Sequence, residues 1–354
     1  MNNKARKLYQ AAETGDVEAV KELLTEATAL EINSRSSNSE KSTPLIIAAK
    51  RGYPAIVDAL LADGRADVNI RNKHGSTALT WASWNINNET VIALLGRADI
   101  DVNMQDGDKW SALIHACEKG RTDSVKSLLQ HPDIQVNAFG GANSDDTALM
   151  FACSADRKFT KTVEALLEHP DIDVNVRNPT TGYTALMYAT FKDYSRTVSA
   201  LLRDPNIDVN MRRKENNMTA LMIASDRACI KSLCALLEHP EINVYLKSKR
   251  GETAYDMATN EHTRTLLKQH MDANPAPAAQ APEPAMSNTD SGAESQENDT
   301  EAENDEDDTV AMTPRGASTW GRAHRVVDSQ SQDRLFDGPS PAIATVRMAL
   351  HDRM

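Results

Sequence analysis

The chain has few aromatic residues, few cysteines and no long apolar segment. Only 5% of its 354 residues are Phe, Trp or Tyr. The four cysteines, Cys117, Cys153, Cys229 and Cys234, form no CxxC pair, so buried, reduced thiols are expected rather than a disulfide framework or a metal site. No run of about 18 apolar residues occurs, and the N-terminal residues lack the apolar core of a secretory signal. We therefore expect a cytoplasmic protein, with the nucleus as an alternative, and no membrane contact.

Motifs for catalysis and for cofactor binding are also missing. The sequence contains no GxxxxGK[ST], no GxGxxG after a strand, no HExxH and no GxSxG. The segment DIDVNMQDGD at 99–108 has oxygen-bearing side chains at alternate positions. However, Met104 stands where a calcium loop requires glycine, and Trp110 where it requires glutamate. We therefore predict no enzymatic activity, no cofactor and no bound metal.

The net charge of −12 is concentrated at the C-terminal end. From Ala273 onward, 15 Asp and Glu accompany six Arg and no Lys, whereas residues 1–272 carry 36 acidic and 33 basic side chains. Neither part is basic, which disfavours direct binding to nucleic acid. The balanced part is also long enough to bury a sizeable apolar core.

A short phrase recurs in the balanced part at intervals of 34 to 37 residues. It reads TPLIIAA at 43, TALTWAS at 77, SALIHAC at 111, TALMFAC at 147, TALMYAT at 184, TALMIAS at 219 and TAYDMAT at 253. Between successive copies a Val or Leu precedes a Leu-Leu pair by three and four residues, for example Val125 with Leu128 and Leu129. This spacing places the three side chains on one face of a helix.

A second phrase follows each Leu-Leu pair in the middle of the chain. It reads HPDIQVN at 131, HPDIDVN at 169, DPNIDVN at 204 and HPEINVY at 239. Proline ends a helix, and the following Asp and Asn side chains satisfy backbone groups of a loop. We interpret this phrase as the exit from a helix rather than as a site, and its histidines as helix-end residues rather than metal ligands.

These motifs, in this order, resemble the ankyrin repeat over roughly residues 4–271. The resemblance implies a pair of short antiparallel helices and a hairpin-like loop in each repeat, stacked into a solenoid, because one unit cannot bury its own apolar faces. We therefore predict an all-α, ankyrin-type solenoid of about eight helix-pair repeats followed by a disordered acidic tail. The predicted parts are an N-terminal capping repeat at 1–37, six central repeats at 38–247, a C-terminal capping repeat at 248–272, a disordered linker at 273–309 and a mostly disordered tail at 310–354.

Each part of the repeat has a structural interpretation. The Thr or Ser that opens the first phrase is expected to cap the first helix, and the small residues after it let neighbouring helices approach closely. The valines at 102, 136, 174 and 209 are expected to be buried in the loops, and His115 to be a partly buried core residue. The chain departs from the ankyrin pattern in lacking the His of the TPLH phrase. The loop bonds of that His must therefore be made by other groups.

The resemblance also implies where a partner binds, because ankyrin-like proteins typically use the concave face formed by loop tips and first helices. Matching positions in this chain carry large apolar side chains that are costly to expose: Trp84, Trp110, Tyr183, Phe191 and Met218. Basic or titratable residues surround them: Arg51, Lys73, His74, Lys119, Lys192 and Arg227. We predict that this set forms a protein-binding surface, although individual members could instead pack against the neighbouring repeat.

We accordingly predict a monomeric, non-enzymatic adaptor or scaffold whose partner is another protein. A host-directed effector of an intracellular microbe, which would imply secretion into a host cell, is the alternative; an enzyme and a nucleic-acid-associated factor are further ones. The Pro/Ala-rich linker contains an acidic run, whose composition prevents a core. The tail contains PAIATVRMALHDRM at 341–354, which is compatible with a short amphipathic helix or a docking peptide. The acidic run could also lie in the concave groove and compete with partners.

Overall fold

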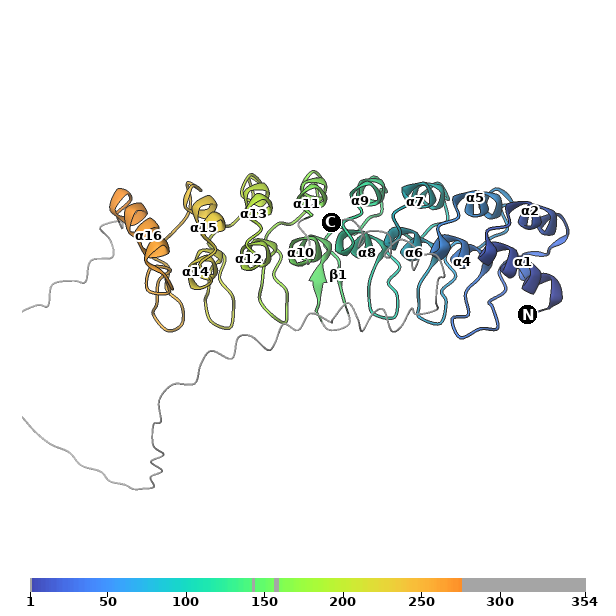
Figure 1. Ribbon diagram of the computed structural model, residues 1–354, viewed down its shortest axis with the longest axis horizontal. Coiled ribbons are helices and arrows are strands. Elements are labelled where there is room, and N and C mark those ends of the chain that lie inside the picture. The colour runs from blue at the N-terminus through green and yellow to red at the C-terminus, as the bar shows by residue number, and fades with distance from the viewer. Residues whose placement is uncertain (1, 142–143, 156–158, 276–354) are drawn as a thin grey trace, which may run out of the picture. The chain divides into compact units, whose positions relative to one another are not determined.

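The computed structural model describes residues 2–141, 144–155 and 159–275, which belong to the first of two compact units, residues 1–283. Within these residues the chain forms two rows of short helices with loops projecting from one row (Figure 1). The predicted solenoid of helix pairs is therefore confirmed. The predicted linker, apart from residues 273–275, and the predicted tail lie outside the described residues.

Most helices of the described residues form seven pairs. The first helices are α1 (Asn3–Thr14), α4 (Pro44–Arg51), α6 (Ala78–Trp84), α8 (Ala112–Glu118), α10 (Ala148–Ser154), α12 (Ala185–Phe191) and α14 (Ala220–Asp226). The second helices are α2 (Val17–Glu26), α5 (Pro54–Ala62), α7 (Asn88–Leu95), α9 (Thr122–Leu129), α11 (Thr160–Leu167), α13 (Ser195–Leu201) and α15 (Ile230–Leu237). Each row packs helix against successive helix.

Four further elements complete the described part of the chain. They are the short α3 (Ala29–Ile32), the final α16 (Glu261–Ala273), and the strands β1 (Phe139–Gly140) and β2 (Asp146–Thr147). The two strands pair antiparallel in the hairpin before α10, with Phe139 opposite Thr147. This small sheet is an addition to the predicted all-α fold, in one of the two hairpins whose sequence is longer than the others.

The predicted helix caps are confirmed at six first helices. In each, the side chain of the opening Thr or Ser accepts a hydrogen bond from the backbone N–H three residues further on: Thr43, Thr77, Ser111, Thr147, Thr184 and Thr219. Pro44 is the first residue of α4, where its missing N–H costs nothing. One such cap contributes about 1 kcal/mol to stability.

The core lies between the two rows of helices. In six of the second helices the Val or Leu and the first leucine are fully buried, as with Val125 and Leu128, and the second leucine is half-buried; in α2 Leu23 is half-buried and Leu24 is buried. In the first helices the small pairs are also buried, for example Ala116 with Cys117. Small side chains at these positions let first helices approach closely, as predicted. The predicted buried loop valines are confirmed at 102, 136, 174 and 209.

The last repeat differs from the predicted helix pair. Residues 254–257 form a turn instead of a first helix. The Thr253 backbone N–H and hydroxyl both donate to one oxygen of Asp256, at 2.8 and 2.7 Å, and Asn260 already caps α16 through the Thr263 N–H. The segment between these two caps is too short for a regular helix. In the described residues, the final unit therefore contributes α16 alone.

One asparagine in each of six successive loops joins neighbouring repeats. Asn137 Nδ2 donates to the backbone carbonyl of Asp171 at 2.7 Å, and its Oδ1 accepts the backbone N–H of Asp173 at 3.0 Å. The same two bonds recur at every equivalent asparagine: Asn33, Asn69, Asn103, Asn175 and Asn210. We call this series the asparagine ladder. It explains why the second phrase ends in Val-Asn.

The histidines of the second phrase also have a structural role. The Nδ1 atoms of His131, His169 and His239 each accept a hydrogen bond from the backbone N–H two residues on, at 3.2 to 3.3 Å. Asp204 makes the equivalent bond through its carboxylate at 2.9 Å. These residues cap the turn that follows each second helix, which agrees with their predicted place at helix ends.

Replacing one residue of the ladder tests its contribution. We expect Asn137→Ala to lower the free energy of unfolding by about 1–2 kcal/mol, because two hydrogen bonds between repeats are lost. Urea denaturation followed by circular dichroism measures this change. Asn206→Ala is the control, because among the described residues the Asn206 side chain bonds to no other repeat. A cost for Asn137→Ala no larger than that of the control would contradict a stabilising ladder.

Candidate protein-binding surface

Aromatic side chains occupy the same position in four consecutive first helices. Trp81, His115, Phe151 and Tyr188 each lie four residues after the capping Thr or Ser, on α6, α8, α10 and α12. Three are almost buried, with exposed fractions of 7% for Trp81 and 9% for Phe151 and Tyr188. Because the helices stack in register, these rings form a column along the row of first helices.

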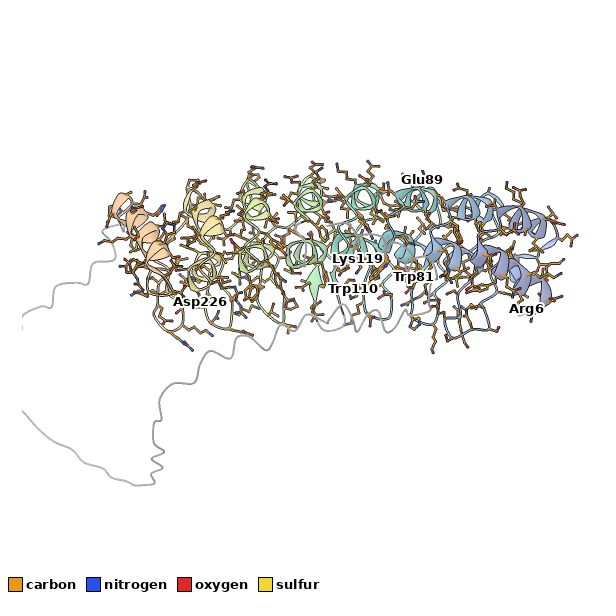
Figure 2. The ribbon with its side chains drawn as sticks, in the orientation of Figure 1. Arg6, Trp81, Glu89, Trp110, Lys119 and Asp226 are labelled. Carbon is orange, nitrogen blue, oxygen red and sulfur yellow. The ribbon has the colours of Figure 1, made fainter. Side chains whose placement is uncertain are left out.

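A central cluster forms where this column meets two predicted site residues. Trp110 lies 4.7 Å from Phe151 and 5.2 Å from His115 between ring centroids, and Trp84 contacts His115 edge-on at 5.8 Å. Lys119 covers the Trp84 ring, with its Nζ atom 3.7 Å from the centroid. Figure 2 labels Trp81, Trp110 and Lys119 along the first-helix row, whereas Glu89 lies on the second-helix row. We call Trp84, Trp110, His115 and Phe151 the central cluster.

An aspartate fixes the loop that carries Trp110. Asp106 Oδ1 accepts the backbone N–H of Asp108 and of Trp110, both at 3.0 Å, and Oδ2 lies 2.8 Å from His115 Nε2. Burial raises the pKa of Asp106, but the hydrogen bond and charge of His115 oppose this and prevail, so the pKa lies below its usual value. His115 is therefore a partly buried, hydrogen-bonded residue, as predicted. Asp106 provides loop bonds in the absence of the ankyrin TPLH histidine.

A second aromatic cluster lies on α12 and its hairpin. Tyr183 stacks on Tyr188 at 4.9 Å and meets Phe191 edge-on at 6.3 Å. Two arginines cover these rings: the Arg213 guanidinium lies 4.4 Å from the Tyr183 centroid and Arg227 lies 3.9 Å from Phe191. We call Tyr183, Tyr188 and Phe191 the C-terminal cluster.

Tyr183 does not have the exposure that the sequence suggested. Its exposed fraction is only 4%, because Tyr188 covers one side of the ring and the buried Arg213 from the next hairpin covers the other. Burial also raises the pKa of the Tyr183 hydroxyl. Tyr183 thus packs against the neighbouring repeat, while Phe191 and Arg227 remain partly or fully accessible.

The remaining five predicted site residues lie in hairpins or near the ends of first helices. Arg51 is exposed and pairs with Glu13 of α1 at 3.5 Å. Lys73 and His74 lie in the hairpin before α6, and Lys192 is the C-cap of α12. Met218 is half-buried just before α14, where its backbone N–H is bound by Asn216. All of them come from hairpins or from the ends of first helices.

A buried carboxylate adjoins the C-terminal cluster. Asp146 Oδ1 accepts a hydrogen bond from Asn178 Nδ2 at 2.6 Å, and the Tyr188 hydroxyl also bonds to this carboxylate. Asp146 is 6% exposed. Burial raises its pKa from 3.8 to about 6, because desolvation outweighs the two hydrogen bonds. The hairpin before α10 is therefore linked to the next one through a group that titrates near neutral pH.

Sequence reasoning missed the contribution of three side chains to this surface. His115 was expected only as a partly buried core residue, yet its ring joins Trp84 to Trp110, and Phe151, for which no surface role was predicted, also contacts Trp110. No bond from Asp146 to the next hairpin was predicted either. The recurrence of aromatic residues four positions after four consecutive caps was visible in the sequence and could have revealed the column.

The opposite side of the solenoid has a different character. A cavity of about 730 Å³ lies at the N-terminal ends of α11 and α13, lined by hydroxyl groups, exposed charged side chains and the rings of Phe159 and Tyr194. The buried Thr162 and Thr197 hydroxyls there pair with Thr122 and Thr160, at 2.8 and 3.1 Å. No grouping of three or more metal-ligating side chains occurs among the described residues. Over the same part of the chain, no helix is long and apolar enough to cross a membrane.

Comparison with known proteins identifies the family. The family described as ankyrin repeats (3 copies) matches residues 8–106, 87–178, 113–213 and 157–248. The chain belongs to the ankyrin repeat family. Ankyrin repeats are generally non-catalytic modules for protein–protein interaction, so the coarse functional prediction agrees with the family.

Two solved structures illustrate the similarity. EF0377, an ankyrin repeat protein, is 28% identical; the match covers 56% of this chain and 96% of that protein, with a TM-score of 0.50. The ankyrin repeat domain of Bcl-3, a member of the IkappaB protein family, is 20% identical over 74% of this chain and 97% of that domain, with a TM-score of 0.48. The first of these supports the fold directly.

The raised pKa of Asp146 predicts how stability depends on pH. The folded protein holds this proton more tightly than the unfolded chain, so ionisation of Asp146 lowers stability as the pH rises through about 6. Asp146→Asn removes this effect. We expect the free energy of unfolding of the variant, relative to the parent chain, to rise by up to about 3 kcal/mol between about pH 4 and about pH 7.

Urea denaturation across this pH range measures the difference. Asp58→Asn, which removes a charge from the exposed face of α5, controls for the change in net charge. If the Asp146→Asn difference stays constant with pH, Asp146 ionises in the folded protein as readily as in the unfolded chain, and the prediction is wrong.

Proposed function

We propose that the chain is a non-catalytic adaptor or scaffold that binds a protein partner through the surface of the central and C-terminal clusters. The observation that carries this proposal is the pairing of partly exposed rings with cations on that surface: Lys119 lies over Trp84, and Arg227 over Phe191. Trp84, Phe191 and Lys119 are only partly buried, and Arg227 is exposed. A partner covering them would remove apolar area from water.

The side chains of this surface are held in place before a partner arrives. Trp110 is fixed by its contacts with His115 and Phe151 and by the Asp106 hydrogen bond to its backbone. Prior ordering reduces the entropy lost on binding. Tryptophan and arginine in such positions are the residue types that most often dominate binding energy, at about 2 kcal/mol or more each.

The chemistry of the surface favours a polypeptide with both apolar and acidic side chains. The rings offer apolar area, and Arg227 and Lys119 offer donors to carboxylates at its edge. Lys119 already pairs with Glu118 at 3.0 Å, so a partner carboxylate would exchange for that contact. Arg51 and Lys73 add positive charge on the side of the N-terminal repeats. All of these residues come from one chain, so the proposed surface needs no second copy. Action as a monomer inside the cell is part of the same proposal.

Affinity capture with the full chain tests the proposal. We expect a chain with Trp84→Ala, Phe191→Ala and Arg227→Ala to retain its helical circular dichroism and to lose at least about tenfold in affinity for the captured partner, because each truncation removes a contact of the hot-spot type. The binding constant is then measured with the purified partner.

Leu30→Ala with Ile92→Ala is the matched control. These side chains are 81% and 55% exposed and belong to α3 and α7, neither of which contributes a residue to the two clusters. If this control weakens binding as much as the three-residue variant, or if the three-residue variant binds like the parent chain, the two clusters are not the binding surface.

A further inference from the structure

The hairpins of the last two repeats carry a concentrated positive charge. Arg212 and Lys214 in the hairpin before α14, and Lys247, Lys249 and Arg250 in the hairpin after α15, are all exposed. The acidic residues in the same two hairpins are Glu215, which pairs with the buried Arg213 at 2.8 Å, and the half-buried Glu252. We call the five exposed cations the basic loop surface.

The two hairpins form one surface because they are bonded to each other. The Lys249 backbone N–H donates to the Asn216 carbonyl at 2.9 Å. Each preceding hairpin carries at most two cations: the one before α6 contains Arg71 and Lys73 and the one before α12 contains Arg177, whereas those before α8 and α10 carry more acidic than basic side chains. Among these hairpins, the highest concentration of positive charge is therefore at the C-terminal end of the solenoid.

The C-terminal end of the described chain is attached to the same hairpin. Tyr245 stands where the other loops have the ladder asparagine, and its hydroxyl donates to the carbonyls of Met271 and Asn274, at 3.3 and 2.9 Å. Lys247 follows Tyr245 by two residues. The chain that continues past residue 275 thus starts beside the basic loop surface.

The sequence that follows is complementary in charge. Residues 283–308 contain 11 Asp and Glu and no Lys, Arg or His; we call them the acidic segment. Residues 276–282 connect it to the solenoid, and a connection of this length spans at most about 25 Å. The start of the acidic segment is therefore tethered within about 25 Å of the end of the described chain, which Tyr245 attaches to the hairpin that carries Lys247.

We propose that the basic loop surface is a binding site for an acidic polypeptide and that its occupant is the chain's own acidic segment. Because the segment is joined to the solenoid by a short tether, its side-chain carboxylates have an effective concentration in the millimolar range, about that of short flexible linkers generally. An external anionic peptide must compete with this concentration. The proposal goes beyond the partner surface of the aromatic clusters and does not depend on it.

Binding of a fluorescein-labelled polyglutamate peptide to the full chain tests the proposal at low ionic strength. In a neutralised variant, every Glu of the acidic segment is replaced by Gln and every Asp by Asn. We expect this variant to bind the peptide at least about tenfold more tightly than the parent chain, because the tethered competitor has been removed. Raising the salt to about 1 M should abolish binding, since the Debye length falls to about 3 Å.

Charge reversal locates the site. Adding Lys247→Glu, Lys249→Glu and Arg250→Glu to the neutralised variant should reduce peptide affinity by at least about tenfold. The matched control adds Lys126→Glu, Lys161→Glu and Lys231→Glu, which reverse exposed lysines on second helices and should leave the affinity unchanged within a factor of about two.

Three results would overturn the proposal. The first is equal peptide affinity, or no binding, in the parent chain and the neutralised variant. The second is equal loss from the loop reversals and from the control reversals. The third is binding of labelled single-stranded DNA to the parent chain as tight as that of polyglutamate to the neutralised variant, which would make nucleic acid the occupant. None of these measurements uses a protein partner, so their failure is distinct from failure of the aromatic-surface proposal.

Discussion

The asparagine ladder is the constraint on which the arrangement of this solenoid depends. Each asparagine of the ladder donates one hydrogen bond to a backbone carbonyl of the next loop and accepts another from a backbone N–H, as Asn103 does with Asp133 and Gln135. Each asparagine therefore fixes both the distance and the direction from one repeat to the next. Burial of Val102 and its equivalents stabilises the loops, but apolar contact alone is non-directional and does not set a register.

Because the offset between repeats is fixed, equivalent positions of successive repeats lie side by side and form one surface. Side chains that lie 34 to 37 residues apart in sequence become neighbours because their helices stack with the same orientation. In this way His115 reaches both Trp84 and Trp110, which belong to different repeats or loops. The same geometry buries Tyr183 beneath Arg213. A side chain that lies between two repeats thus contacts both of them, and the neighbouring repeat determines how much of that side chain is exposed.

The distribution of charged side chains also changes along the solenoid. Most cations of the aromatic surface have a carboxylate or a ring as partner, such as Lys50 with Glu40 at 2.5 Å and with Trp81. At the C-terminal end the ladder stops at Tyr245, and the two neighbouring hairpins expose the five cations of the basic loop surface. The ladder therefore ends where the hairpins carry the most positive charge, and the central repeats do not combine these two features.

The sequence by itself determined the helix pairs, their caps and the buried loop valines, because hydrophobic spacing, Thr or Ser caps and proline act within a few residues. It also identified Trp84, Trp110, Phe191 and Arg227 as surface candidates. It did not predict the turn at 254–257, which depends on Thr253, Asp256 and Asn260 competing for the same short segment. The burial of Tyr183 and the raised pKa of Asp146 were decided only by the tertiary structure. Both depend on groups supplied by the next repeat, whose distance no local pattern encodes.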